Sequence, residues 1–187
     1  MGAGCGPEPR ALLAARPGYF RAMPDQAVTR FLRSRWGGPL DGPAIAFSHL
    51  GRGGLAWLLA ETVVRQRSGE RVRPSRAVVG SVALAYGGSL LLARMIGRPR
   101  PCDGNGTALI ECPNGPGLPS DQAAGAFAAA AAVRLRHRRA GIGLYVAATG
   151  VAAGRVYCGV HHLSDVVAGA ALGVIAARLA ASTGCLE

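Results

Sequence analysis

Five long apolar stretches follow one another along most of this chain and limit the folds open to it. They lie near residues 44–64, 77–97, 121–135, 140–157 and 163–181. Alanine and glycine dominate them, and only 5% of the 187 residues are aromatic. Small residues at this density suit helices that pack closely, as membrane helices do. We therefore expect an all-α fold, a membrane-embedded helical bundle of about five apolar helices.

The lengths of the stretches leave one alternative open. Some are shorter than the ~20 residues that span a bilayer, and Arg52 and Glu61 interrupt the first. A soluble helical bundle with very apolar helices fits the same pattern.

Residues 1–43 form an N-terminal arm rich in Gly, Pro and Arg, and residues 44–187 form the helical domain. Within the arm, PDQAVTRFLRSRW places Val28, Phe31 and Leu32 on one face of a helix, which predicts an interfacial amphipathic helix. The early apolar run ALLAA is too short for a signal peptide.

Charge narrows the choice of partners. All 21 basic residues are arginine and the formal net charge is +11, a composition typical of a high-GC bacterial genome. This excess of positive charge is compatible with three kinds of partner: nucleic acid, an anionic membrane or a phosphate-bearing substrate. The arginines cluster between apolar stretches without interleaved aromatic residues or zinc-finger spacing, so we expect no nucleic acid partner. The two main clusters are Arg65, Arg67, Arg71, Arg73 and Arg76, and Arg134, Arg136, Arg138 and Arg139.

Cytoplasmic loops of membrane proteins carry an excess of arginine and lysine. If both clusters are cytoplasmic, the stretches alternate in direction and place residues 98–120 and 155–162 on one external face. The N-terminal arm then also lies outside.

The external loops contain ARMIGRPRP, LPSDQ and GRVYCGVHHLSD, which together fit a phosphate-ester site. The guanidinium groups of Arg100 and Arg155 suit phosphoryl oxygens because they form forked, charge-assisted hydrogen bonds. Ser120 lies where a helix is expected to begin, so its hydroxyl and the first-turn amides point at an anion.

The same loops contain a nucleophile. Histidine attacks phosphorus when one ring nitrogen is unprotonated and the other is held by an acceptor. Asp165, four residues after His161, lies one helical turn away if a helix starts near Leu163. It is therefore placed to orient the ring, as the acid does in a Ser-His-Asp triad.

These three stretches resemble the signature of the type 2 phosphatidic acid phosphatase superfamily, K-x6-R-P, P-S-G-H and S-R-x5-H-x3-D. The resemblance covers about half the chain, and its third motif matches best. Arg155, His161 and Asp165 keep the spacing, while Gly154 replaces serine and His162 falls where the family often has an aromatic residue.

The first motif departs from the pattern. Aligning the Arg-Pro pair at Arg100 puts Ala93 in place of the motif lysine, and aligning the pair at Arg98 puts Leu91 there. Arg94, one residue from Ala93, is a candidate to supply the missing cation.

The second motif reads Pro-Ser-Asp-Gln, so Gln122 replaces the histidine with which the family protonates the leaving group. Aspartate in the third place, here Asp121, also occurs in the diphosphate phosphatase branch. General acid catalysis is worth ~10²- to 10⁴-fold, and a phosphate leaving group needs it less than an alkoxide does. We therefore expect a lipid diphosphate substrate. His162 or Asp121 with a raised pKa are alternative acids.

The resemblance implies an integral membrane lipid phosphatase that hydrolyses a prenyl diphosphate or another lipid phosphate through a phosphohistidine, without metal or cofactor. It further implies a multi-pass protein of the cell membrane whose site faces the exterior. Two rivals stay open: a catalytically silent relative that binds or transports a lipid phosphate, and a soluble phosphatase or vanadate-dependent oxidase. The expected catalytic residues are His161, Asp165 and Arg155, and the expected substrate-binding residues are Arg94, Arg100, Ser120, Asp121 and Gln122.

Cys102 and Cys112 bracket the loop before the second motif. An oxidising exterior would join them in a disulfide worth a few kcal/mol. A free pair fits equally, and Cys158 is a competing partner. The histidines and cysteines lack zinc-site spacing.

Overall fold

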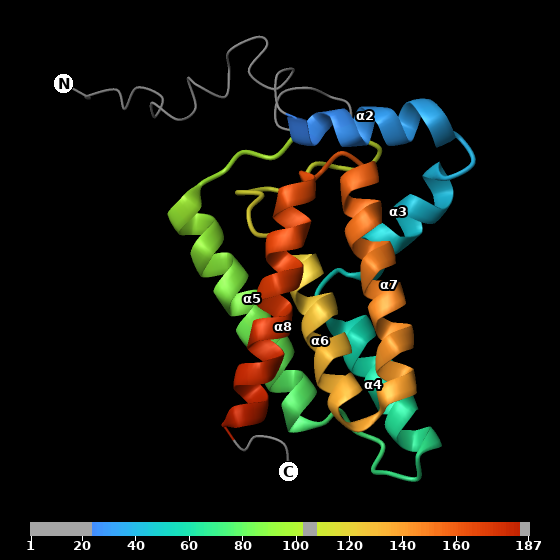
Figure 1. Cartoon of the computed structure of the whole chain (residues 1–187), viewed down its shortest axis with the longest axis vertical. Coiled ribbons are helices and arrows are strands. Elements are labelled where there is room, and N and C mark those ends of the chain that lie inside the picture. The colour runs from blue at the N-terminus through green and yellow to red at the C-terminus, as the bar shows by residue number, and fades with distance from the viewer. Residues whose placement is uncertain (1–23, 103–107, 184–187) are drawn as a thin grey trace, which may run out of the picture.

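A computed structural model describes residues 24–102 and 108–183, and within these ranges every regular element is a helix (Figure 1). The predicted all-α fold is confirmed. The helices are α2 (Pro24–Trp36), α3 (Asp41–Leu50), α4 (Leu55–Arg67), α5 (Arg76–Ile96), α6 (Asp121–Arg136), α7 (Arg138–Tyr157) and α8 (Leu163–Ser182).

Four predicted stretches match α5, α6, α7 and α8 closely, but the prediction of one helix over 44–64 is wrong. The chain folds there as α3 and α4, separated by a glycine-rich turn. Gly53 and Gly54 have φ values of 71° and 73°, in the left-handed region that residues with a side chain rarely enter. The turn therefore ends the first helix after Leu50. The domain boundary expected at residue 43 falls inside α3, which begins at Asp41.

The centre of the bundle is α6, which packs against α5, α7 and α8 (Figure 1). Alanines along α6 are completely buried, so neighbouring backbones approach it closely. The closest approach is by α8, where a β-carbon on Gly169 or Gly173 would overlap the carbonyl of Ser120 or Ala124. This spacing of small residues, four apart, is the one that lets helices pack tightly in membranes.

The helices α5 to α8 alternate in direction, so the bundle has two chemically different ends (Figure 1). At the end that we call the arginine end, Glu70 lies 3.0 Å from both Arg65 and His137. These contacts join the loop after α4 to the turn between α6 and α7, which brings the two predicted arginine clusters together. At the opposite end, which we call the site end, the segment after α5 meets the segment after α7.

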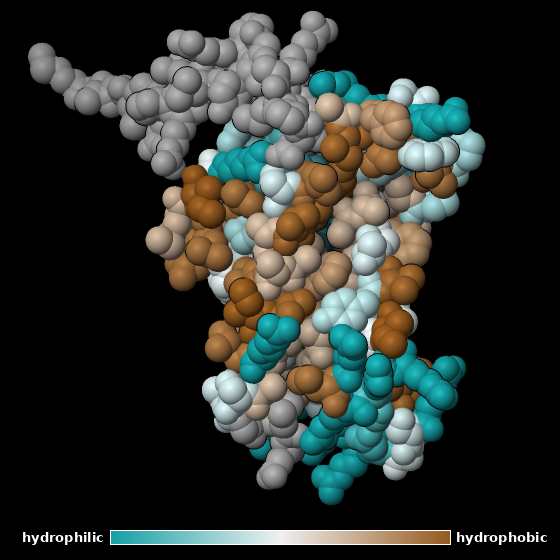
Figure 2. Space-filling view, viewed as in Figure 1, coloured by the Kyte–Doolittle hydropathy of each residue, from teal (hydrophilic) through white to brown (hydrophobic). Residues whose placement is uncertain are grey.

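The sides of the bundle carry an apolar band between the two ends (Figure 2). By length and hydropathy α5 and α8 are each able to cross a membrane. Leu84, Leu91 and Met95 of α5 are 52%, 61% and 69% exposed, so this helix presents large apolar side chains outward.

Helix α2 lies across the site end (Figure 1). Thr29 Oγ1 donates to the Val156 carbonyl at 3.0 Å, and Arg33 Nε donates to the Tyr157 carbonyl at 2.8 Å. Val28 packs against a small apolar cluster that includes Val156, whereas Phe31 is 61% exposed. The predicted helix of the arm is therefore present and docked on the bundle, while residues 1–23 of the arm lie outside the described residues.

Candidate active site

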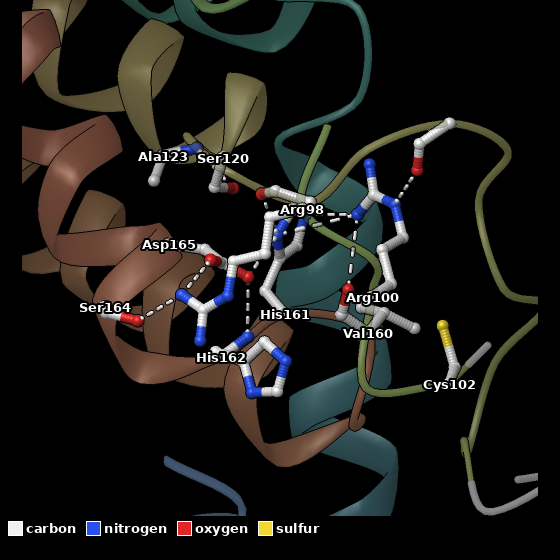
Figure 3. A network of polar contacts seen from close by, with 12 residues as sticks. Arg98, Arg100, Cys102, Ser120, Ala123, Val160, His161, His162, Ser164 and Asp165 are labelled. Atoms are coloured by element: carbon white, nitrogen blue, oxygen red, sulfur yellow. Dashed lines mark hydrogen bonds and ion pairs between the residues drawn. The ribbon is translucent and has the colours of Figure 1, made fainter. Parts of the chain in front are cut away.

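The segments that the sequence analysis singled out converge at the site end (Figure 3). The backbone N–H of Ser120 donates to the Asp165 carbonyl at 2.9 Å, and that of Gly117 donates to the Arg98 carbonyl at 2.8 Å. The first bond joins the segment between α5 and α6 to the first turn of α8, and the second closes that segment on itself. Side chains from three distant stretches therefore share one buried cluster.

His161 lies at the centre of this cluster and is completely buried. Its Nδ1 is 2.9 Å from the Gly117 carbonyl, and its Nε2 is 2.6 Å from Nη1 of Arg100. A carbonyl only accepts hydrogen bonds and a guanidinium only donates them. Nδ1 therefore carries the proton, and the lone pair of Nε2 faces Arg100.

Burial lowers the pKa of His161 below its ordinary value, because the imidazolium form loses its hydration. Asp165 raises this pKa, and the positive charges of Arg100 and Arg155 lower it. The ring is consequently neutral at pH 7, the form that a nucleophile requires.

Asp165, in the first turn of α8, makes its hydrogen bonds to the neighbours of His161 and not to the imidazole ring. Its Oδ2 is 3.6 Å from Nδ1 of His161, beyond ordinary hydrogen-bond length. That oxygen accepts the His162 N–H at 2.8 Å, and Oδ1 accepts from Arg98 at 2.9 Å. The direct acceptor of the His161 proton is thus Gly117.

Two buried guanidiniums flank the histidine. Arg100 is 6% exposed and also donates to the carbonyls of Gly115 and Val160, at 3.0 and 3.2 Å. Arg155 is 2% exposed and donates to Ser48 Oγ of α3 at 3.2 Å. Its Nε has no hydrogen-bond partner among the described residues. A buried charge without a carboxylate is costly, so this arrangement favours binding of an anion.

The second motif forms the start of α6, as predicted. Ser120 is the N-cap, is completely buried, and accepts the Ala123 N–H at 3.4 Å. Asp121 is the first helical residue. Gln122 is 8% exposed, and its Oε1 has no partner in the described part of the chain. The end of α6 thus offers a buried hydroxyl and an unbonded amide oxygen beside the cluster.

Arg94 does not join the cluster. It is exposed on α5, whereas Ala93 is buried. Successive residues of a helix point about 100° apart, so a cation at position 94 does not replace a lysine at position 93.

Three residues outside the predicted set contribute to the site. Arg98 binds both Ser164 Oγ, at 2.6 Å, and Asp165 (Figure 3). The second Arg-Pro pair of the first motif was the available signal for it. Gly117 acts through a backbone carbonyl and Ser48 comes from a separate helix, so sequence spacing indicates neither.

Cys102 and Cys112 form a disulfide with Cα atoms 5.9 Å apart. Of the alternatives that the sequence left open, the structure shows this pairing, and Cys158 is a buried free thiol. Within residues 24–102 and 108–183, no group of three or more His, Cys, Asp or Glu is placed to hold a metal ion.

Solved structures that share this fold include two that cover most of the chain. LpxE from Aquifex aeolicus superposes with a TM-score of 0.66 at 23% identity, over 83% of this chain and 93% of that one. The first transmembrane PAP2-type phosphatidylglycerolphosphate phosphatase from Bacillus subtilis superposes with a TM-score of 0.60 at 20% identity, over 92% of this chain and 90% of that one. At these identities the likeness shows the fold.

Comparison with curated protein sequences yields no match. The family model of the PAP2 superfamily, however, matches residues 75–184, which is more than half of the chain and includes the whole histidine cluster. The resemblance of the three motifs is thereby confirmed, and the chain belongs to the PAP2 superfamily.

Proposed function

We propose that this protein is a multi-pass membrane phosphatase that hydrolyses a lipid diphosphate through a phosphohistidine at His161. The observation that carries the proposal is the orientation of the His161 ring. Its protonated Nδ1 is fixed by the Gly117 carbonyl, and its Nε2 lone pair faces Arg100 at 2.6 Å. A neutral histidine with a guanidinium at its reactive nitrogen is an arrangement suited to attack on a phosphoryl group.

The first chemical step transfers the phosphoryl group to the protein. Arg100 moves from Nε2 to a phosphoryl oxygen when the substrate enters. Arg155 donates to Ser48 through Nη1, and it binds another phosphoryl oxygen through its Nε, which has no partner among the described residues. Nε2 attacks phosphorus in line while the bond to the bridging oxygen breaks. The leaving lipid monophosphate takes the electron pair of that bond.

The second step releases phosphate. Water attacks the phosphorus of the phosphohistidine, the P–N bond breaks, and its electron pair returns to Nε2. Both protons of the water leave with the product as dihydrogen phosphate, so the histidine is neutral again. Asp165 stabilises the positive ring of the intermediate from 3.6 Å, and the ion pair with Arg98 positions Asp165. At the start of α6, the Ser120 hydroxyl, the Gln122 side-chain amide and the backbone N–H of Asp121 donate to the phosphate oxygens and the leaving group.

Gln122 supports a diphosphate rather than a monoester as the substrate. An amide donates a hydrogen bond but delivers no proton, and an alkoxide leaving group needs that proton most. The monophosphate released from a diphosphate is a much weaker base. A prenyl diphosphate combines this leaving group with an apolar chain that suits the apolar band on the sides of the bundle.

Gln122 also favours a second candidate, a silent relative that binds a lipid phosphate without cleaving it. The acid of the family pattern is absent at this position, and position 93 is an alanine. The intact geometry around His161 favours the enzyme, because a protein that only binds needs no oriented imidazole.

We place the site end outside the membrane and the arginine end in the cytoplasm. Support comes from the excess of arginine at one end, which is typical of cytoplasmic loops. In this orientation α2 of the N-terminal arm lies at the outer interface.

The decisive experiment measures phosphate release from a polyprenyl diphosphate and from phosphatidate by protein purified in detergent. We expect release from the diphosphate, slower release from phosphatidate, and a loss of about 10⁴- to 10⁶-fold in His161→Ala. A thermal melt of the variant controls for folding. Binding of both lipids without release from either would establish the silent binder, and fast release from phosphatidate alone would reject the diphosphate.

A further inference from the structure

A pocket lined by three arginines lies at the arginine end, at the opposite end of the bundle from His161. Its volume is about 420 Å³, and α6, α7 and α8 each contribute to its walls. Arg134, Arg138 and Arg178 line it together with Tyr145 and several aliphatic side chains. It shares no residue with the candidate active site.

The charge of this pocket is uncompensated. Each of its three arginines is exposed, and none has an acidic partner within 4 Å in the described part of the chain. Glu70, which contacts His137 beside Arg138 in the sequence, is already bound to Arg65 and His137. Three like charges repel one another, so an anion that contacts all three would be bound strongly.

The rest of the pocket is apolar. Leu135 of α6 and Val174 and Ala177 of α8 form its aliphatic wall. Helices α7 and α8 pack mainly against α6 rather than each other, so the pocket opens along the side of the bundle between them. Next to it, Leu135 and Ile175 are 58% and 52% exposed. A ligand with a phosphate and an apolar chain uses both surfaces, whereas free phosphate uses only the arginines.

We propose that this pocket binds the headgroup of an anionic phospholipid, with the phosphate at the three arginines and an acyl chain along the groove between α7 and α8. This inference depends on one part of the proposed function, namely that the protein lies in a membrane. The inner leaflet is rich in anionic lipid, and each nearby arginine adds about 1 kcal/mol of attraction. The lipid is proposed here as a bound ligand, because the pocket shares no residue with the candidate active site.

The test measures binding of phosphatidylglycerol and of phosphatidylcholine to the full chain in neutral detergent, by native mass spectrometry. We expect selective retention of phosphatidylglycerol by the wild type. The triple variant Arg134→Gln, Arg138→Gln, Arg178→Gln should bind it on the order of 100-fold more weakly. The matched control is Arg71→Gln, Arg73→Gln, Arg76→Gln, which removes the same charge from exposed positions at the same end and should bind like the wild type.

Three results would overturn the proposal. Equal weakening in both triple variants would mean a diffuse charge effect, and unchanged binding in the pocket variant would mean that the lipid lies elsewhere. Displacement of the lipid by millimolar inorganic phosphate would mean a free-phosphate site. Phosphate release measured on the same samples keeps the two proposals separate, because a protein that retains the lipid but hydrolyses no diphosphate would contradict only the proposed enzyme.

Discussion

The two ends of the bundle use the same residue type for different purposes. At the site end, Arg100 and Arg155 are 6% and 2% exposed and surround a neutral histidine. At the arginine end, Arg67, Arg71 and Arg73 are exposed to solvent. Hydrophilic side chains gather at this end of the face shown in Figure 2. Burial, and not the number of charges, distinguishes a site that holds an anion in fixed geometry from a surface that attracts anions generally.

The ion pairs at the two ends show the same difference. Arg98 and Asp165 are 2.9 Å apart, and Arg65 and Glu70 are 3.0 Å apart. The Asp165 side chain is completely buried, whereas that of Glu70 is 32% exposed. Contacts of equal length should therefore contribute unequally to stability.

The largest expected effect comes from removing the acid of each pair. Asp165→Asn removes a completely buried carboxylate from its pair with Arg98, whose side chain is 21% exposed, and should cost about 3 kcal/mol of unfolding free energy. Glu70→Gln should cost at most about 1 kcal/mol. Unfolding in mixed micelles measures the free energy lost by each variant. Equal losses would show that burial does not make the ion pair of the site end stronger than that of the arginine end.

The next effect concerns catalysis. Arg100→Gln removes a charge aimed at the reacting phosphoryl group and should lower kcat/KM for a lipid diphosphate by about 10²- to 10³-fold. Arg67→Gln removes the same charge from the arginine end and should leave kcat/KM unchanged. Steady-state phosphate release compares them, and a large loss in Arg67→Gln would mean that distant charge contributes to turnover.

A smaller effect is expected from restoring an acid at the start of α6. Gln122→His should increase hydrolysis of phosphatidate by about tenfold or more, since general acid catalysis helps an alkoxide leave. Hydrolysis of the diphosphate should change less. Gln122→Asn is the control, because an asparagine side chain cannot donate a proton to the leaving group. A similar increase in phosphatidate hydrolysis in both variants would contradict the proposed role of Gln122 in selecting the leaving group.

The smallest effect is the pH dependence of stability. The folded state holds the pKa of His161 below its unfolded value of 6.5, so the unfolded chain binds the proton first as the pH falls. Stability should therefore decrease below about pH 6.5, with a slope of at most about 1.4 kcal/mol per pH unit from this group. The arginines of the opposite end add no such slope, because they stay protonated.

Unfolding of the wild type and of His161→Gln between pH 7 and 5 measures this slope, since their difference isolates the histidine. If the wild type instead becomes more stable than the variant as the pH falls, the pKa of His161 is raised in the folded state, and the direction assigned here is wrong.

Most helices were predictable because their ends carry local signals. Ser75 and Ser120 each cap a helix with a side-chain hydrogen bond, and apolar runs define the rest of α5 and α6. The first stretch failed because its apolar content continues through the glycine turn at Gly53 and Gly54, and hydropathy does not register a left-handed backbone.

The candidate site was predictable where residue spacing fixes geometry. Arg155, His161 and Asp165 follow one another across a single turn between α7 and α8, so their proximity is nearly local. The contact of Gly117 with the histidine is long-range and comes from a backbone carbonyl, which no side-chain motif records. Arg94 failed for a different reason, since a shift of one residue turns a side chain out of the bundle.

The length of α6 has a consequence for how strongly the site binds charge. It has 16 residues, against 21 in α5 and 20 in α7, and it begins well below the site end of its neighbours (Figure 1). Ser120 and His161 are therefore enclosed in a medium of lower dielectric constant than water. Coulombic attraction at an effective dielectric constant of about 20 is about four times that in water. A shortened central helix thus strengthens the attraction between the buried arginines and each additional negative charge on a group bound beside them.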